Sequence, residues 1–268
     1  IGGEFRPIEG FDPELKRPII GDDISNLNSP YIEVESPAGA MLRRDAKMMV
    51  DPNLAPDIPV PILNIITQIE NGGMAKNVQR NILNKINSCD IITNDNWINI
   101  TKTRYVHEKT NHTFFRVDTP HDIKRINLNE INYNYKIIVV SDYNKGFLSE
   151  SDIETICDNH DLVFIDTKKI LGNWASKAKF IKINDYEYQR TKDYISDKLK
   201  NKIIHTIGGD GCEYQGKQYK VKKVDVKDTS GAGDSFMAAL VVNYLNTNNI
   251  DKAIKYANEC ASEVVKYR

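Results

Sequence analysis

Short apolar runs alternate with amphipathic stretches from about Leu54 to the C-terminus. Four of these runs are continuous and rich in β-branched residues, the pattern of strands covered on both sheet faces: residues 136–140, 162–165, 180–183 and 203–207. Between the first two runs, Ser149 and Asp152 resemble a capping box that opens a helix. The order strand, helix, strand predicts an α/β fold with a mainly parallel central sheet.

Residues 1–53 have a different pattern. Several prolines interrupt a polar stretch with little periodicity, which is typical of an irregular or extended segment: Pro7, Pro13, Pro18, Pro30 and Pro37. We therefore expect an irregular N-terminal arm of unknown role over residues 1–53 and an α/β domain over residues 54–268. The arm offers a segment for docking on a larger complex or on a second copy of the chain.

Each predicted strand ends in polar residues. They are Ser141 and Asp142 after the first strand, residues 166–168 after the second, Asn184 after the third, and Gly208 and Gly209 after the fourth. In open sheets of parallel strands, ligands bind beyond the carboxyl ends of the strands. We therefore expect these residues to converge on one rim and to form a binding site there.

Charge and cysteine content narrow the class of partner. The chain of 268 residues has 36 Lys and Arg against 37 Asp and Glu, a formal net charge of −1, so no overall field favours nucleic acid or an anionic membrane. Its four cysteines have no CxxC pair and no metal-ligand spacing with the histidines, which indicates reduced thiols. No apolar run is long enough to span a bilayer, and no secretory leader is recognisable. These features predict a cytoplasmic protein with a small-molecule partner.

A glycine-rich loop, Asp228–Asp234, precedes an apolar segment of helix length over residues 236–245. The unpaired amides of a first helical turn and the positive end of the helix dipole form an anion site, and Gly231 and Gly233 let a phosphate approach the backbone. Asp234 is then placed to orient and deprotonate an attacking hydroxyl, as phosphoryl transfer requires. The alternative is a tight turn in which Asp234 only caps the helix.

The same loop resembles the C-terminal signature of the ribokinase-like, or PfkB-type, carbohydrate kinases. Their N-terminal signature, two glycines followed by a small residue and then Asn, is similar to residues 72–77, Gly-Gly-Met-Ala-Lys-Asn. The resemblance implies a ribokinase-like three-layer sandwich, an alcohol acceptor, and ATP and Mg²⁺ as cofactors. It also implies three sets of site residues: Asp234 as the catalytic base, the amides of Gly231, Ala232 and Gly233 as the anion hole, and Gly72, Gly73 and Asn77 near the sugar.

Within this family, several stretches are similar to the heptose-7-phosphate kinases: residues 55–61, 101–104, 116–118, 141–146 and 166–168. The likeness implies that Arg104, Arg116, Asp142 and Lys145 contact a sugar or sugar phosphate. A carboxylate, an amide and an ammonium within residues 141–146 suit a phosphorylated polyhydroxy ligand. A solvated polar turn is the alternative for this stretch, and fructose, ribose or a nucleoside is the alternative acceptor.

The family resemblance also implies a set of residues around the nucleotide. Asn184 and Glu187 match an Asn-x-x-Glu element that acts on the magnesium and phosphate surroundings, with Glu187 reaching the metal through water. The residues that border the nucleotide are Thr206, Gly208 and Gly211 in a strand-to-glycine turn, and Asn258 near the adenine. Lys168 is placed to reach a phosphate as a point charge, and its alternative is a solvated surface lysine.

One departure from the family bears on activity. Family members open with a strand that ends in Gly-Asp, and no equivalent stands before Ala55; Asp51, which Pro52 follows, is the nearest candidate. Two hypotheses therefore stand at this point. The chain is either an active sugar kinase, or a kinase-derived assembly protein that docks on a larger complex through residues 1–53.

Overall fold

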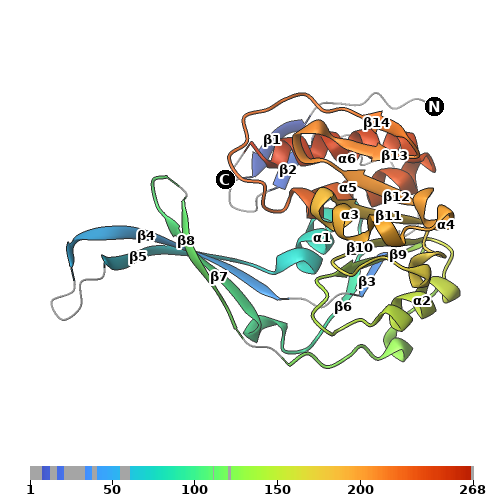
Figure 1. Ribbon diagram of the computed structural model, residues 1–268, viewed down its shortest axis with the longest axis horizontal. Helices are drawn as coiled ribbons and strands as arrows, with labels where there is room; N and C mark the ends of the chain where they lie inside the picture. Colours follow the sequence, from blue (N-terminus) through green and yellow to red (C-terminus); the bar gives the residue numbers. More distant parts are fainter. Residues whose placement is uncertain are drawn as a thin grey trace.

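The computed structural model describes residues 8–12, 17–20, 34–37, 41–54, 61–110, 112–119 and 122–266. Over these residues the chain forms a large sheet with helices on both faces, and a smaller sheet that projects to one side of this body (Figure 1). A hairpin of β1 (Ile8–Asp12) and β2 (Arg17–Ile20) lies beside α6 (Ile250–Val264). The body is the predicted three-layer α/β sandwich.

The large sheet has eight strands in the described part of the chain. Their order across the sheet is β14 (Lys217–Tyr219), β13 (Cys212–Tyr214), β12 (Ile203–Thr206), β11 (Phe180–Asn184), β10 (Val163–Thr167), β9 (Ile137–Asp142), β3 (Val34–Pro37) and β6 (Asp90–Ile92). Neighbours from β12 to β6 pair in parallel, and β12, β13 and β14 pair antiparallel. The predicted parallel sheet is confirmed, and β9 to β12 correspond to the four predicted strands.

Helices fill the connections between these strands. They are α1 (Gly73–Leu83), α2 (Glu150–Asn159), α3 (Asp185–Thr191), α4 (Asp197–Lys200), α5 (Ala232–Thr247) and α6, with short 3-10 turns at η1 (Trp97–Asn99), η2 (Leu128–Glu130), η3 (Asn173–Ala175), η4 (Lys192–Tyr194) and η5 (Gly208–Asp210). The longest helices, α5 and α6, lie together on one face of the large sheet (Figure 1).

Alternate side chains of the central strands enter two separate cores, as the two-residue period of a strand requires. Val139 and Phe164 pack with buried residues of α1, α5 and α6 on one face of the sheet. Ile138 and Ile165 pack with buried residues of α2 and α4 on the other face. All four side chains are 0% exposed, so both faces of the sheet are covered. A ligand would therefore bind at the ends of the strands and not on either face.

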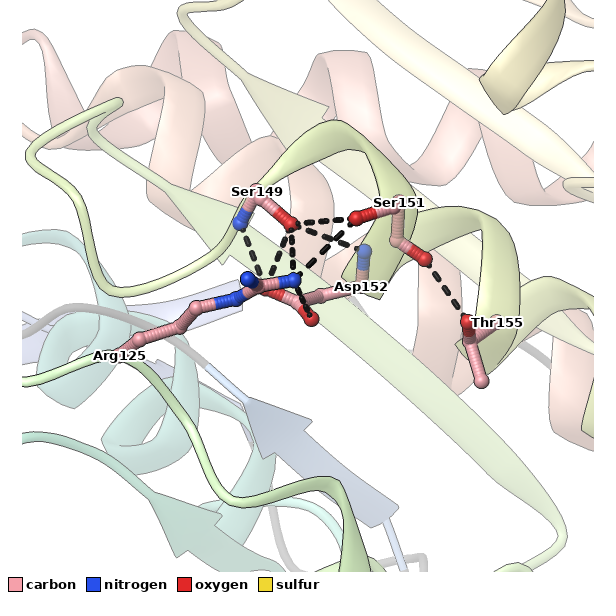
Figure 2. Close-up of polar contacts among 5 residues, drawn as sticks. All are labelled: Arg125, Ser149, Ser151, Asp152 and Thr155. Atoms are coloured by element: carbon pink, nitrogen blue, oxygen red, sulfur yellow. Dashed lines mark hydrogen bonds and ion pairs between the residues drawn. The ribbon is translucent and has the colours of Figure 1, made fainter.

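Helix α2 begins with the predicted capping box. Ser149 Oγ accepts a hydrogen bond from the Asp152 amide at 3.1 Å, and Asp152 Oδ2 accepts one from the Ser149 amide at 2.8 Å. Arg125, on the loop before β9, donates from Nε and Nη2 to the two oxygens of the Asp152 carboxylate, each at 2.7 Å (Figure 2). These bonds tie the loop to the first turn of α2 and confirm the predicted cap.

The smaller sheet has the order β5 (Pro61–Asn71), β4 (Leu42–Leu54), β7 (Thr101–His107) and β8 (Thr113–Asp118). Pairing is antiparallel between β4 and β5 and between β7 and β8, and it is parallel between β4 and β7. In register, Asp45 of β4 lies opposite Arg104 of β7, which lies opposite Arg116 of β8. One face of this sheet therefore carries a row of charged side chains.

Part of residues 1–53 differs from the expected irregular arm. Strand β3 lies inside the large sheet between β9 and β6, and β4 lies between β5 and β7, so the expected boundary after residue 53 falls within a strand. The Val-Glu-Ser-Pro sequence of β3 has little apolar periodicity, and only its pairing with β9 and β6 makes it a strand. Strand β3 does not end in Gly-Asp, so the expected departure from the family pattern stands for this strand.

Candidate active site

The glycine-rich loop ends where α5 begins. Gly231 occupies the N-cap position with φ of 83°, and no atom lies within 4 Å of the Cβ that another residue would place there. The left-handed backbone at this position favours glycine because a side chain would strain it. The open space at Gly231 leaves room for an anion beside the first turn of α5 and the positive end of its dipole, while the Ala232 amide donates to the Thr229 carbonyl at 3.3 Å.

Asp234 lies in this first turn of α5 and contacts Asn77, the last residue of the N-terminal glycine signature. The Asn77 side chain on α1 donates from Nδ2 to Asp234 Oδ2 at 3.0 Å, across 157 positions of sequence. Gly73 starts α1 with φ of 68°, and a Cβ there would come within 2.4 Å of the Met41 carbonyl oxygen. Since Gly231 holds the cap position and Asp234 follows it inside the helix, the alternative in which Asp234 caps α5 does not describe the loop.

The surroundings of Asp234 favour a base that works near neutral pH. Burial raises the pKa of Asp234 to about 6, although the hydrogen bond from Asn77 acts in the opposite direction. The nearby Asp166 carboxylate raises this pKa further, and the Lys182 and Lys168 ammonium groups lower it. A carboxylate with a pKa close to the working pH accepts a proton from a hydroxyl more effectively than an ordinary aspartate does.

A buried ion pair lies next to Asp234. Lys182 on β11 is 4% exposed, Asp166 on β10 is 1% exposed, and their Nζ and Oδ2 atoms are 2.8 Å apart. The Lys182 Nζ is also 2.9 Å from the position that a Cβ on Gly233 would take. Sequence reasoning missed this pair, although a lysine inside the apolar Phe-Ile-Lys-Ile run is unusual because buried charges need partners.

One cavity of about 770 Å³ brings the predicted nucleotide-side residues together with the catalytic loop. Its lining includes Lys168, Asn184, Thr206, Gly208, Gly211, Ala232, Gly233, Asp234 and Asn258, together with Asp166 and Lys182. The lining combines the carboxyl ends of β10, β11 and β12 with the first turn of α5. The strand ends therefore converge on one rim, as the alternation of strands and helices predicts.

Asn184 and Glu187 form a capping box at the start of α3. Asn184 Oδ1 accepts from the Glu187 amide, and Glu187 Oε2 accepts from the Asn184 amide, both at 2.9 Å. The Lys168 ammonium forms an ion pair with the same carboxylate. Glu187 is 4% exposed at its side chain, so the box and Lys168 hold this carboxylate in one place beside the cavity.

Thr206 and Asn258 make structural bonds as well as lining the cavity. Thr206 Oγ1 donates to the Ile183 carbonyl at 3.2 Å, and Asn258 Nδ2 donates to the Tyr219 carbonyl at 2.9 Å. The second bond ties α6 to β14. These side chains therefore shape the wall of the cavity through bonds to the strands behind them.

Four cations form a group around Lys102 of β7, whose charge interacts with those of the other three. They are Lys102, Arg116, Lys145 and Lys168, which we call the basic cluster. Burial lowers the pKa of Lys102, and of its charged neighbours Asp118 opposes this effect while the other three cations reinforce it. The Lys102 Nζ also lies 4.9 Å from the centre of the Tyr143 ring. Cations that together disfavour the charged form of Lys102 favour an anionic ligand beside it.

Arg104 and Asp142, both predicted to contact the sugar, have structural partners, and so does Arg116, whose Nε lies 2.7 Å from Asp118 Oδ1. Arg104 Nε lies 2.9 Å from Asp45 Oδ1, and its Nη2 donates to Ser230 Oγ at 3.2 Å, so this side chain joins the smaller sheet to the glycine-rich loop. Asp142 is 1% exposed and accepts hydrogen bonds from Thr167 Oγ1 and from the Asn144 amide, both at 2.9 Å. Asp142 therefore organises the turn after β9 from inside it.

Comparison with known proteins decides the family. The profile of the pfkB family carbohydrate kinases matches residues 119–268, which is more than half of the chain. The chain belongs to this family. The PfkB chain is also 26% identical to the bifunctional protein HldE of Helicobacter pylori (strain J99), over 79% of this chain and 58% of that protein. It is 31% identical to the probable fructokinase-6, chloroplastic, of Arabidopsis thaliana, over 38% of this chain and 32% of that protein.

Solved structures confirm the ribokinase-like fold of this PfkB protein. The ribokinase of Thermotoga maritima superposes with a TM-score of 0.65 at 15% identity, covering 88% of this chain and 93% of that one. The nucleoside kinase of Methanocaldococcus jannaschii gives a TM-score of 0.63 at 16% identity, covering 90% and 94%. The aligned region spans only 32% of the fructokinase and 58% of HldE, so these relatives are longer than the part they share with this chain.

One predicted stretch of the PfkB chain lies partly outside the residues that the structure describes. Residues 55–60 lie outside the described ranges, so the likeness of the 55–61 stretch has no structural account here. In the part of the chain that the structure describes, no three His, Cys, Asp or Glu side chains form a group able to hold a metal ion. All four cysteines are buried and free. None of the described helices combines the length and the apolar character needed to cross a membrane.

Proposed function

We propose that this PfkB protein transfers the γ-phosphoryl group of ATP to a hydroxyl of a sugar or sugar phosphate. The observation that carries the proposal is the position of Asp234. Its carboxylate lies in the first turn of α5, beside the amides of Gly231 to Gly233 and on the wall of a large cavity. A general base next to a preformed anion hole is the arrangement that phosphoryl transfer to an alcohol needs.

The residues of this chain divide the chemical work as follows. Asp234, ionised above its pKa of about 6, accepts the proton of the acceptor hydroxyl. Asn77 holds the carboxylate in position through its 3.0 Å hydrogen bond. The amides of Gly231, Ala232 and Gly233, with the positive end of the α5 dipole, stabilise the negative charge that develops on the transferred phosphoryl group.

The cavity fits a nucleotide with its metal. The open space at Gly231 accommodates a phosphate that a Cβ would exclude, and Asp166 Oδ1 is a buried acceptor with no hydrogen-bond partner among the described residues. Asn184, Lys168 and, through water, Glu187 would hold the phosphates and Mg²⁺ on this side. When bound, the metal would supply positive charge that offsets the charge of the phosphates.

The basic cluster supports a phosphorylated acceptor. Lys102 and Arg116 belong to strands β7 and β8 of the smaller sheet, Lys145 follows β9, and none of the three lines the cavity that holds the nucleotide-side residues. Neutral sugars need hydroxyl-binding groups, whereas a second phosphate needs cations of this kind. Relatives that match the chain include HldE and fructokinases, and the cluster favours a sugar phosphate of the heptose 7-phosphate type over free fructose.

A turnover screen tests both parts of the proposal. ADP release would be measured with ATP and Mg²⁺ against heptose 7-phosphate, fructose 6-phosphate, fructose and ribose. We expect turnover with a phosphorylated sugar, and a loss of at least about a hundredfold in Asp234→Asn with ATP binding retained. Equal turnover in Asp234→Asn would contradict the role of Asp234 as the general base. A preference for free fructose or ribose would contradict only the proposal that the acceptor is phosphorylated.

A further inference from the structure

A buried ion pair lies directly behind the anion hole. Lys182 and Asp166 leave the ends of β11 and β10 on the same rim, 4% and 1% exposed at their side chains. Phe164 and Phe180, two residues earlier in the same strands and on the same face of the sheet, are 0% and 5% exposed and belong to the apolar core that α5 covers. The ion pair therefore lies between this apolar core and the cavity that the same two residues line.

Stability does not account for this pair. Removing two charges from water costs several kcal/mol per ion by general estimate, and replacing a buried pair with apolar residues of similar volume is often neutral or stabilising. Asp166 adds to the cost because its Oδ1 is buried without a hydrogen-bond partner among the described residues. A role in ligand binding explains why charges stand where isoleucine or leucine would pack.

The position of the ammonium points to that role. Lys182 Nζ lies 2.9 Å from the site where a Cβ on Gly233 would be, so the ammonium occupies the space beside the glycine backbone of the anion hole. One of its three N–H donors goes to Asp166 Oδ2 at 2.8 Å. Asp234 and Gly233 line the same cavity. The cation is therefore next to the place where the transferring phosphoryl group would bind.

The ammonium stays charged in this surrounding. Burial alone lowers the pKa of Lys182, but the charge and the hydrogen bond of Asp166, with the charges of Glu187 and Asp234, outweigh burial and raise this pKa above its ordinary value. A fixed cation with little solvent around it interacts strongly with a phosphate.

We propose that Lys182 is a further phosphoryl-binding residue that completes the anion hole, and that Asp166 is a positioning residue that holds its ammonium in place. This proposal rests on the proposed function. In the transfer step the bond between the γ-phosphorus and the bridging oxygen of ADP breaks, the bond to the acceptor oxygen forms, and the acceptor proton passes to Asp234. Lys182 offsets the charge on the non-bridging oxygens during this exchange, together with the amides of Gly231 to Gly233.

A double variant, Lys182→Met with Asp166→Leu, removes both charges without leaving one of them unpaired. We expect it to fold with a thermal midpoint equal to or above that of the parent. Its kcat falls by about a hundredfold or more, the size of effect that follows loss of one anion-hole donor. Its KM for the acceptor stays within about threefold of the parent value, because neither residue belongs to the basic cluster.

Calorimetric titration with ATP and with ADP, in Mg²⁺, separates a phosphate-binding role from a structural one. We expect the double variant to bind ADP with the parent's affinity and ATP at least about tenfold more weakly, since a hydrogen bond to a charged group is lost at the γ-phosphate only. Lys202→Met is the matched control. Lys202 is a partly buried lysine that donates to the Ala178 carbonyl at 2.6 Å, away from the cavity, and its loss should leave both affinities unchanged.

Three other outcomes of these experiments also decide for or against a proposal. If the double variant does not fold, Lys182→Gln takes its place, because the amide still donates to Asp166 while the positive charge is gone; the same fall in kcat and in ATP affinity is expected. Parent-like kcat together with a parent-like ratio of ATP to ADP affinity in the folded variant overturns the proposal. Absence of turnover in the parent with any sugar refutes the proposed function instead, and the ATP and ADP titrations still decide whether Lys182 binds the γ-phosphate.

Discussion

At the scale of single residues, the site depends on carboxylates and ammonium groups placed where water is scarce. Asp234 is the clearest case, because burial raises its pKa to about 6 while Asn77, Lys182 and Lys168 act in the opposite direction. A group of this kind is costly to the fold and valuable to the chemistry. Activity and stability should therefore respond to Asp234 in opposite directions.

The pH dependence of turnover is the first prediction at this scale. Asp234 acts as a base only when ionised, so kcat/KM should fall as the pH drops below about 6, by about tenfold per pH unit in the acid limb. Initial rates of ADP release between pH 4.5 and about 8, at saturating ATP, measure this limb. An acid limb centred near pH 4, where an ordinary aspartate titrates, would contradict the raised pKa.

The stability of Asp234→Asn is the second prediction. The folded-state pKa of about 6 exceeds the ordinary value of 3.8, so the folded state prefers the protonated carboxyl, and this preference is lost as pH rises through the two values. At pH 7 the neutral amide should therefore raise the thermal midpoint above that of the parent. Below about pH 4, where the carboxyl is protonated in both states, the difference should disappear. Scanning calorimetry at the two pH values checks the sign.

At the scale of elements, helix starts carry most of the polar organisation. The first turn of α5 would form the proposed anion hole, the first turn of α3 fixes Glu187, and α2 begins with the box of Ser149 and Asp152 (Figure 2). Helices α2 and α3 begin with capping boxes whose side chains accept from first-turn amides. Glycine at the N-cap of α5 provides no such side chain.

Replacement of Asp152 is the prediction for this scale. Burial by itself would raise the pKa of Asp152, but hydrogen bonds from Arg125 and Ser149 outweigh it and hold the pKa below its usual range. Asp152→Ala should lower the free energy of unfolding by about 1–2 kcal/mol at pH 7 through loss of the cap. The loss should shrink as the pH falls below the ordinary carboxyl pKa of 3.8 and vanish only below the depressed folded-state pKa, where the carboxyl is protonated in both states.

Denaturant unfolding of Asp152→Ala and of Asp158→Ala gives the comparison for this helix. Asp158 is a partly exposed residue of the same helix, paired with Lys177 at 2.7 Å, and its removal should change stability little because exposed ion pairs contribute little. Neither variant should alter kcat, since both residues lie outside the lining of the cavity. Equal losses of unfolding free energy in the two variants would show that the capping box stabilises the protein no more than an exposed ion pair does.

At the scale of the whole molecule, two sheets meet at the catalytic loop. Arg104 on β7 reaches Ser230 beside the anion hole, and the same guanidinium is held by Asp45 of β4. The projecting sheet in Figure 1 is therefore connected to the loop that would bind the phosphoryl group. An acceptor bound between the sheets would contact groups from both of them.

Deletion of residues 1–53 is the prediction for the whole molecule. The deletion removes β3 from between β9 and β6, and β4 from between β5 and β7, so the backbone groups of those neighbours would lose their pairing partners. We expect loss of the cooperative thermal transition and aggregation on purification. A monodisperse variant with the parent's transition would contradict this expectation and would also count against residues 1–53 as a docking arm.

Much of the body could be predicted from local patterns. Continuous β-branched runs identified β9 to β12, and the Ser149–Asp152 spacing identified the start of α2, because strand burial and capping depend on neighbours in sequence. Strand β3 could not be found this way, because its short polar sequence becomes a strand only through pairing. Asp142 also differs from expectation, since its carboxylate is used inside the turn that was predicted to bind substrate.

The amino-acid sequence by itself determined the alternation of strand and helix from β9 to β12, the glycine-rich loop before α5 and the position of Asp234 at the end of that loop. These depend on side-chain period and on backbone freedom, which act over a few residues. The tertiary structure alone decided that Asn77 orients Asp234, that Asp166 and Lys182 meet behind Gly233, and that the pKa of Asp234 lies near 6. These depend on distance and desolvation among residues far apart in the chain, which no local pattern records.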